Sequence, residues 1–190
     1  MGPGAQNAPL ASVPQPMSDS LTRVPHLVLL RDKLAMHSGF QIQDPSGRPV
    51  GEISGGAPGL LSGLTLLDTD RRVVLCLQAA RGQGPRFGVM IQDATGRVLA
   101  TMQPKTSFGS QKWGISVGTA EPMMLVIDVG GLHYHLEEAG TGRVLATADR
   151  QMAVRTSRTD IQIPEVPDMD HRIVIGSMIA AAFFTIRGSI

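Results

Sequence analysis

Few side chains in this sequence have the types and spacing that chemistry requires, and the histidines come first among them. His133 and His135 stand two residues apart, so both imidazoles would face the same side of a strand. Such a pair could begin a metal site, but no third ligand is evident, and a polar face between neighbouring strands is the alternative. His171 stands beside Asp168 and Asp170, which we assign to the start of a helix rather than to a catalytic dyad. We predict no metal site.

Motifs that mark enzymes do not occur in the context that their chemistry requires. The sequence contains no phosphate-binding P-loop, no H-E-x-x-H zinc motif and no dinucleotide fingerprint, and its one G-x-S-x-G match, at 114–118, falls inside the predicted strand 112–118 instead of at a turn between a strand and a helix. The lone Cys76 lies in an apolar run, which is typical of a small core residue, and it excludes an intramolecular disulfide. We therefore predict no catalytic residue and no cofactor, and we expect a protein that is not an enzyme.

The segment 103–113 has the composition of a binding loop. It holds two of the three lysines of the chain, one phenylalanine and the single tryptophan, namely Lys105, Phe108, Lys112 and Trp113. Lysine beside an exposed aromatic ring suits a lipid headgroup or a membrane interface. A polar hairpin loop with Trp113 turned into the core is the competing interpretation. Arg155 and Arg158, just before the last predicted strand, would extend a basic patch.

The overall composition narrows the class of protein and of partner. The 190 residues have a formal net charge of +1, with 42% hydrophobic and 17% charged residues. This is the balance of an ordered globular domain, and no bulk field would draw it to nucleic acid. The N-terminus has neither the basic start nor the apolar stretch of a secretory signal, so we expect a cytoplasmic protein. The excess of arginine over lysine indicates a GC-rich bacterial genome.

The first 22 residues differ in composition from the rest of the chain. They are rich in proline, glycine, alanine and serine and hold few large apolar side chains. Such a segment cannot bury enough surface to offset the entropy lost on ordering, so residues 1–22 are predicted to be a disordered tail. Docking of this tail onto a protein partner is the alternative. One folded domain is expected over residues 23–190.

From residue 26 onwards, short apolar runs alternate with turn residues, as in an all-β domain. One hairpin pattern occurs at 40–50, again at 89–99 and more loosely at 134–145, and the sequence Thr-Gly-Arg-Val-Leu-Ala-Thr occurs unchanged at 95–101 and 141–147. Aspartate accepts hydrogen bonds from its own backbone and glycine tolerates a positive φ, so each copy predicts a hairpin turn. The predicted turn residues are Asp44, Gly47, Asp93, Gly96 and Gly142. Predicted strands cover 26–32, 38–43, 49–54, 60–67, 72–79, 86–92, 97–103, 112–118, 123–129, 131–137, 143–149 and 159–163.

The C-terminal segment contains an uncharged run from Ile173 to Ile186. Asp168 or Asp170 can cap a helix here, and the alanines favour helix over strand, which predicts a helix at about 170–187. This run has 14 residues and would be roughly 21 Å long as a helix. A helix that crosses a bilayer needs roughly 20 apolar residues. We expect the run to be buried inside a barrel, and a short membrane anchor is the alternative. The buried side chains would include Ile173, Ile175, Ile179, Phe183 and Phe184.

Two of these features resemble features of one protein family, which comprises phospholipid scramblases, tubby-like proteins and LURP-one-related proteins. One is the hairpin at 40–50, echoed at 87–99, and the other is the acidic-to-apolar step Pro-Asp-Met-Asp-His-Arg-Ile-Val-Ile-Gly at 167–176. The resemblance covers roughly residues 24–187. It implies a mainly β, tubby-like fold, in which a closed, roughly twelve-stranded antiparallel β-barrel surrounds a buried hydrophobic C-terminal helix.

For function, the resemblance implies a non-enzymatic protein that binds phospholipid, because tubby-like proteins are known for phosphoinositide binding through basic groups. The expected partner is an anionic phospholipid or a membrane surface, with the protein peripheral at the membrane. Only Asp168 and Asp170 match the proposed calcium-binding segment of scramblases, so calcium-triggered lipid transport is not expected. The alternative is a structural or assembly component that acts through protein–protein contacts, made by edge strands or by the N-terminal tail.

Overall fold

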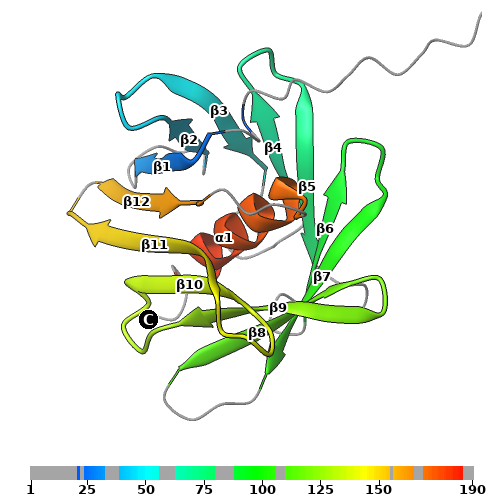
Figure 1. Cartoon of the computed structure of the whole chain (residues 1–190). Coiled ribbons are helices and arrows are strands. Elements are labelled where there is room, and N and C mark those ends of the chain that lie inside the picture. Colours follow the sequence, from blue (N-terminus) through cyan, green and yellow to red (C-terminus); the bar gives the residue numbers. More distant parts are fainter. Residues whose placement is uncertain are drawn as a thin grey trace, which may run out of the picture.

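The computed structural model describes residues 21, 24–32, 39–55, 63–79, 88–105, 110–154, 156–164 and 169–185. Within these ranges the chain forms a meander of strands followed by one helix (Figure 1). The elements are β1 (His26–Asp32), β2 (Phe40–Gln43), β3 (Pro49–Ser54), β4 (Leu64–Asp68), β5 (Val73–Ala79), β6 (Val89–Asp93), β7 (Val98–Lys105), β8 (Gln111–Val117), β9 (Ala120–Ile127), β10 (His133–Glu138), β11 (Val144–Met152), β12 (Thr156–Gln162) and α1 (His171–Thr185).

The strands form a closed antiparallel barrel, which confirms the predicted fold. Each strand pairs with its neighbours in sequence, and β1 closes the ring by pairing with β12. The closing register sets Leu27 opposite Ile161 and Leu29 opposite Thr159. Closure leaves no unpaired edge among the strands that the structure describes, so edge strands no longer support an assembly role.

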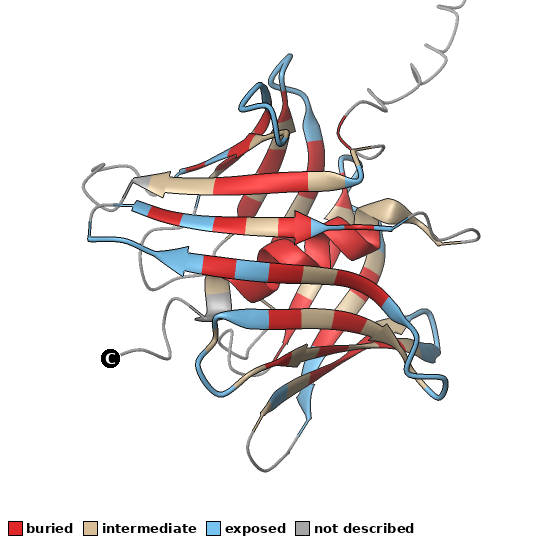
Figure 2. Ribbon diagram, turned by 60° about the vertical axis from the view of Figure 1, so that its left-hand side comes forward, coloured by how far each residue is buried: buried red, intermediate tan, exposed pale blue. Residues whose placement is uncertain are grey.

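The apolar faces of the strands and the whole of α1 make up one core. Figure 2 shows an almost entirely buried helix inside strands that alternate between buried and exposed residues. Ile173, Ile175 and Ile179 are all buried, and the Ser177 hydroxyl donates to the Ile173 carbonyl at 2.8 Å. Phe183 is half-buried and packs against the core, whereas the side chain of Phe184 lies outside the described residues.

The start of α1 is held by Asp170, one of the two predicted capping residues. Its Oδ1 accepts the backbone N–H of Arg172 at 3.0 Å, and its carbonyl accepts that of Ile173 at 2.9 Å. The Arg172 guanidinium also donates to the same carboxylate, at 2.6 Å for the shortest contact. These bonds satisfy donors that a helix leaves free in its first turn. Asp168, the other candidate, lies outside the described residues.

Hairpins of one type connect β2–β3, β4–β5 and β6–β7. In the β6–β7 hairpin, Gly96 N–H donates to the Asp93 carbonyl and Asp93 N–H to the Arg97 carbonyl, each at about 3 Å. The glycine has φ +83°, and the strand register shifts beside the turn, as in a type I turn followed by a bulge. The predicted turns at Asp44 and Asp93 are confirmed. The turn at Asp68 was not predicted, because Arg71, with φ +61°, occupies the glycine position.

The two ends of the barrel differ, and we name them by their connections. The turn end carries the connections 44–48, 69–72, 94–97, 118–119 and 139–143. The loop end is where the odd-numbered strands β1 to β11 finish and where the even-numbered strands β2 to β12 begin. The helix begins near the turn end and runs through the barrel towards the loop end (Figure 1).

The core extends further towards the N-terminus than the predicted domain boundary at residue 23. Leu21 is fully buried, and its Cδ1 lies 2.7 Å from where a Cβ on Gly51 would stand. The glycine therefore makes room for a leucine that the sequence analysis assigned to the tail. Residues 1–20 lie outside the described residues, so the disordered tail stays a prediction.

Candidate functional site

The loop end brings together both regions that the sequence analysis selected for binding. Gln111 at the start of β8 is opposite Ile127 at the end of β9, and Leu132 after β9 accepts the backbone N–H of Arg150 at 2.7 Å. On the next pair of strands, Met152 of β11 is opposite Ser157 of β12. The described parts of the two regions, 103–105 with 110–113 and 152–154 with 156–158, therefore border one continuous arc of the barrel rim.

The two lysines of the first region stand opposite each other at the end of the β7–β8 ladder. Lys105 Nζ contacts Glu121 Oε2 at 2.8 Å, and this pair crosses over Gly114, where a Cβ would lie only 2.5 Å from both side chains. Lys112, its cross-strand partner, forms no ion pair with any residue that the structure describes. Lys112 is therefore the lysine of this loop whose charge is available to an outside anion.

The one aromatic residue of this region that the structure describes does not present its ring to solvent. Trp113 is 6% exposed and belongs to the core, because it alternates with Ile115 on the inward face of β8. It is therefore not a membrane-facing residue, and the competing interpretation of this loop applies to it. Phe108 and Arg155 lie outside the described residues. Arg158 is described, and it donates to Asp160 through Nε at 2.8 Å and Nη2 at 2.7 Å.

Aliphatic side chains project from the same end of the barrel, and the sequence analysis did not select them. Val129, between β9 and β10, is 86% exposed, and Val154, between β11 and β12, is 95% exposed. Met152 and Leu132 stand beside them and are also exposed. The exposed valines of the turn end are less prominent, and the most exposed of them are Val98 and Val144, at 49% and 47%. In the sequence, the only indication of this exposed surface is that an apolar residue occurs within a turn.

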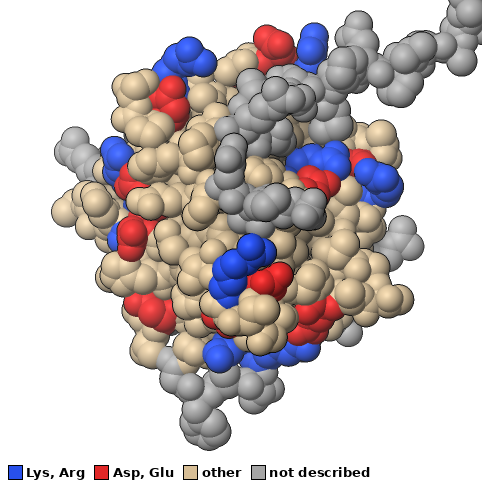
Figure 3. Space-filling model, in the orientation of Figure 1, with Lys and Arg blue, Asp and Glu red and all other residues tan. Residues whose placement is uncertain are grey.

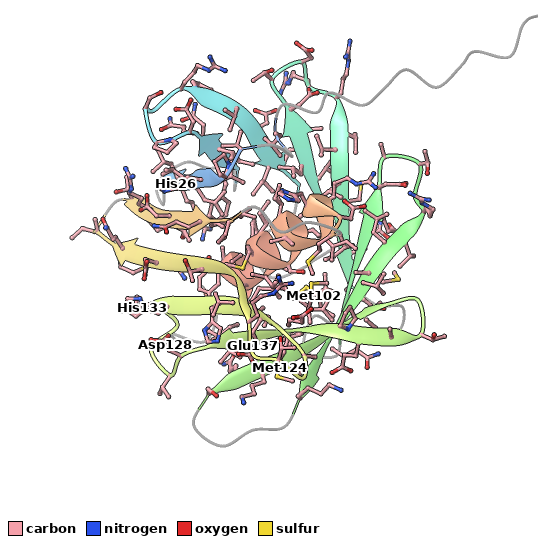
Figure 4. All side chains as sticks on the ribbon, viewed as in Figure 1. His26, Met102, Met124, Asp128, His133 and Glu137 are labelled. Carbon is pink, nitrogen blue, oxygen red and sulfur yellow. The ribbon has the colours of Figure 1, made fainter. Side chains whose placement is uncertain are left out.

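The predicted histidine pair lies on β10, and Figure 4 shows His133 on the outside of the barrel. His133 Nδ1 contacts Asp149 Oδ1 of β11 at 2.5 Å, and His135 Nε2 contacts Glu137 Oε2 at 3.3 Å. Asp128 accepts the backbone N–H groups of Leu132 and His133, so it serves the turn. No group of three potential metal ligands occurs within the described part of the chain.

Buried polar residues line the interior towards the loop end. Tyr134, Arg150 and Thr159 face inward on β10, β11 and β12, and Arg31 follows Leu29 on the inward face of β1. Burial raises the pKa of Tyr134 well above its usual value, so its hydroxyl stays protonated. Burial also lowers the pKa of Arg150, and the nearby charge of Arg31 adds to that effect. These residues were missed because polar residues break the apolar alternation that identifies a strand.

Surface charge is mixed rather than segregated. Basic and acidic side chains are interspersed over the face that Figure 3 shows. At the turn end the charges pair locally, for example Arg97 with Asp93 at 3.1 Å and Arg143 with Glu138 at 3.4 Å. Pairs of this kind neutralise each other, so the described residues of the face in Figure 3 form no extended single-sign field that would attract a highly charged polymer.

Comparison with known proteins places the fold. No protein-family profile matches the chain, and no curated protein matches it. Among solved structures, the X-ray structure of the Arabidopsis thaliana protein AT5G01750 matches with a TM-score of 0.58, over 86% of this chain and 93% of that chain. The chain has the tubby-like fold.

The match confirms, for the fold, the resemblance to tubby-like and LURP-one-related proteins. Sequence identity to the Arabidopsis protein is 14%, so the likeness concerns the fold alone, and function must be argued from this chain's own residues. In the part of the chain that the structure describes, no helix combines the length and the apolar character needed to cross a bilayer.

Proposed function

We propose that this protein is a non-enzymatic binding module of the cytoplasm whose loop end docks onto an anionic phospholipid surface. The proposal rests above all on one observation, the presence of the two most exposed valines of the described chain, Val129 and Val154, on the arc that also carries Lys112. A membrane interface accepts aliphatic side chains into its apolar layer while its headgroups attract lysine.

The magnitudes support a weak, reversible attachment. Burying one fully exposed valine side chain contributes roughly 1.5 kcal/mol, and each lysine or arginine near an anionic leaflet contributes roughly 1 kcal/mol. Val129, Val154 and one or two basic groups would together give a few kcal/mol before the entropy of association is subtracted. Such an attachment would be peripheral and would depend on salt, because charges separated by more than about 10 Å are screened at about 0.1 M salt.

The acidic groups of the loop end do not oppose this docking strongly. Asp128 is engaged with backbone N–H groups of its own turn, and Asp149 contacts His133 across the β10–β11 ladder. Asp160 is paired with Arg158 through two hydrogen bonds. A carboxylate that already accepts hydrogen bonds or pairs with a cation repels an anionic surface less than a free one.

Co-sedimentation with vesicles tests the proposal. The full chain is mixed at low salt with vesicles of phosphatidylcholine alone or of phosphatidylcholine with phosphatidylserine. We expect sedimentation with the anionic vesicles, little with the neutral ones, and release from the anionic vesicles as salt is added. Protein that stays in the supernatant with anionic vesicles at low salt would show that the loop end is not a lipid-docking surface.

A further inference from the structure

The outer wall of the barrel, next to the proposed docking surface, carries one histidine between two aspartates. His133 is the first residue of β10 and follows the connection that holds the exposed Val129 and Leu132 (Figure 4). On one side, the Asp128 N–H after β9 donates to the His133 carbonyl at 3.0 Å. On the other side, His133 is opposite Asp149 of β11. An ionisable side chain therefore lies between two acidic neighbours at the rim.

The imidazole of His133 contacts one of these carboxylates and remains open to solvent. Its Nδ1 lies 2.5 Å from Asp149 Oδ1, and the two side chains are 69% and 59% exposed. Asp128 accepts the N–H groups of Leu132 and His133 through Oδ1, so it brings its negative charge into the same turn. Arg150, which follows Asp149 on β11, is buried and does not offset these charges at the outer surface. Histidine is the side chain whose charge ordinarily changes between about pH 5 and pH 8.

The other described charged groups around this histidine have partners of their own or lie further away. Along β10, His135 contacts Glu137 at 3.3 Å. Beyond β11, Asp160 of β12 is paired with Arg158 through two hydrogen bonds. Lys112 is two strands away, on β8. A proton on the first imidazole of β10 is therefore the change that alters the balance of charge directly beside the β9–β10 connection.

We propose that protonation of His133 strengthens the docking of the loop end onto anionic phospholipid, so that lipid binding responds to acidification. This inference rests on the proposed function and adds a regulation to it. With a neutral imidazole, the contact between His133 and Asp149 carries one negative charge close to Val129, and with a protonated imidazole it carries none. One charge near an anionic leaflet changes binding by about fivefold.

The test compares co-sedimentation of the full chain with vesicles at about pH 7.5 and about pH 5.5, on either side of the ordinary histidine titration. The vesicles contain phosphatidylcholine and phosphatidylglycerol, whose charge does not change over this interval. His133→Gln keeps a hydrogen-bonding side chain but takes up no proton. The ratio of the partition coefficients at acidic and neutral pH should be about fivefold larger for the wild type than for His133→Gln.

Two further variants separate this effect from a general change of charge. His26→Gln is the matched control, because His26 also lies near an aspartate, Asp160 at 3.5 Å, but at the end of β1 that is away from the loop end. It should keep the wild-type ratio. Asp149→Asn removes the negative charge at every pH, so at about pH 7.5 it should bind about fivefold more strongly than the wild type. A misfolded variant would not produce such a gain.

Three results would overturn this inference and leave the lipid-docking proposal standing. The first is the same pH ratio in the wild type and in His133→Gln. The second is an equal loss of that ratio in His133→Gln and His26→Gln, and the third is an Asp149→Asn variant that binds no better than the wild type at about pH 7.5. Sedimentation at neither pH would instead refute the docking proposal itself, and this inference with it.

Discussion

Gly176 of α1 lies directly against Ile91 of β6, and a Cβ added at this glycine would stand 2.9 Å from Ile91 Cγ2 and 3.3 Å from its Cδ1. The barrel wall can approach the helix this closely only because the glycine has no side chain. Alanine normally stabilises a helix by roughly 1 kcal/mol relative to glycine. At this position, crowding of the core works in the opposite direction and should exceed that gain.

We predict that Gly176→Ala destabilises the protein by about 1 kcal/mol, because overpacking typically costs about 1–3 kcal/mol and helix propensity returns about 1. Urea unfolding would measure the change. The control is the same substitution made in an Ile91→Ala background, where the crowding atoms are gone. There Gly176→Ala should be neutral or stabilising, and a loss of similar size in both backgrounds would refute direct contact as the cause.

Arg71 provides a second prediction, because it adopts φ +61° at a hairpin position where Gly47 and Gly96 stand in the sister turns. A left-handed conformation costs a residue with a side chain roughly 1–2 kcal/mol. Its exposed pair with Glu52, at 3.0 Å, returns less than about 1 kcal/mol. Arg71→Gly should therefore raise the free energy of unfolding by about 0.5–1 kcal/mol, measured by urea or thermal unfolding.

Arg71→Ala is the matched control for this prediction. It removes the ion pair with Glu52 but keeps a side chain at the left-handed position, so it should be slightly less stable than the wild type. If Arg71→Ala and Arg71→Gly were equally stable, backbone strain at this turn would not explain the effect.

The β6–β7 turn makes stability depend on pH through Asp93. Its Oδ1 accepts the Thr95 hydroxyl at 2.6 Å and the N–H groups of Thr95 and Arg97, and its Oδ2 accepts Arg97 Nε at 3.1 Å. Led by the Thr95 hydroxyl, these bonds lower the pKa of Asp93 from 3.8 to about 2. The carboxylate therefore stabilises the fold fully above the unfolded-state value, and this contribution is lost as the pH falls from about 4 to about 2.

Asp93→Asn should accordingly destabilise the protein at neutral pH by about 1–2 kcal/mol, through the loss of hydrogen bonds to a charged acceptor. The difference in free energy of unfolding between Asp93→Asn and the wild type should shrink as the pH is lowered from about 4 to about 2. Urea unfolding at a series of pH values would measure it. Asp70→Asn, a change of the same charge at an exposed position of the β4–β5 turn, serves as the control. If the difference in free energy of unfolding between the wild type and Asp93→Asn did not change with pH, the lowered pKa of Asp93 would not be the cause of the pH dependence.

Sequence patterns predicted much of this fold because strand alternation, turn residues and an uncharged helix are local properties. The strands at 26–32 and 49–54 were predicted with the limits that the structure has. β11 and β12 extend beyond their predicted limits, β11 to Met152 instead of residue 149 and β12 from Thr156 instead of residue 159. Both strands carry buried polar residues there, Arg150 on β11 and Ser157 and Thr159 on β12, and these interrupt the apolar alternation.

The candidate site was less accessible to sequence reasoning, because closure of the ring creates it. The pairing of β1 with β12 brings Arg31 beside Ser157, which is far away in the sequence. No local pattern contains that relationship, so the inward-facing polar residues where β1 meets β12 were missed even though Arg158 was selected. Similarly, Lys112 and Val154 belong to one surface only because β8 to β12 follow each other around the barrel.

The lipid-docking proposal leads to a final prediction about the exposed valines of the loop end. Val129→Asp combined with Val154→Asp removes apolar surface and adds two negative charges that face the membrane. Together these changes should lower partitioning onto phosphatidylserine-containing vesicles at least about tenfold, since each buried valine contributes roughly 1.5 kcal/mol and about 1.4 kcal/mol corresponds to tenfold. Stability should hardly change, because both side chains are almost fully exposed.

The matched control for this variant places the same two charges at the opposite end, through Val98→Asp with Val144→Asp. Both pairs change the net charge equally, so general repulsion between the protein and anionic vesicles is the same. Only the loop-end pair removes apolar side chains that the proposal inserts into the membrane. Equal losses of vesicle binding in the two variants would mean that net charge governs binding, and the loop end would no longer be the docking surface.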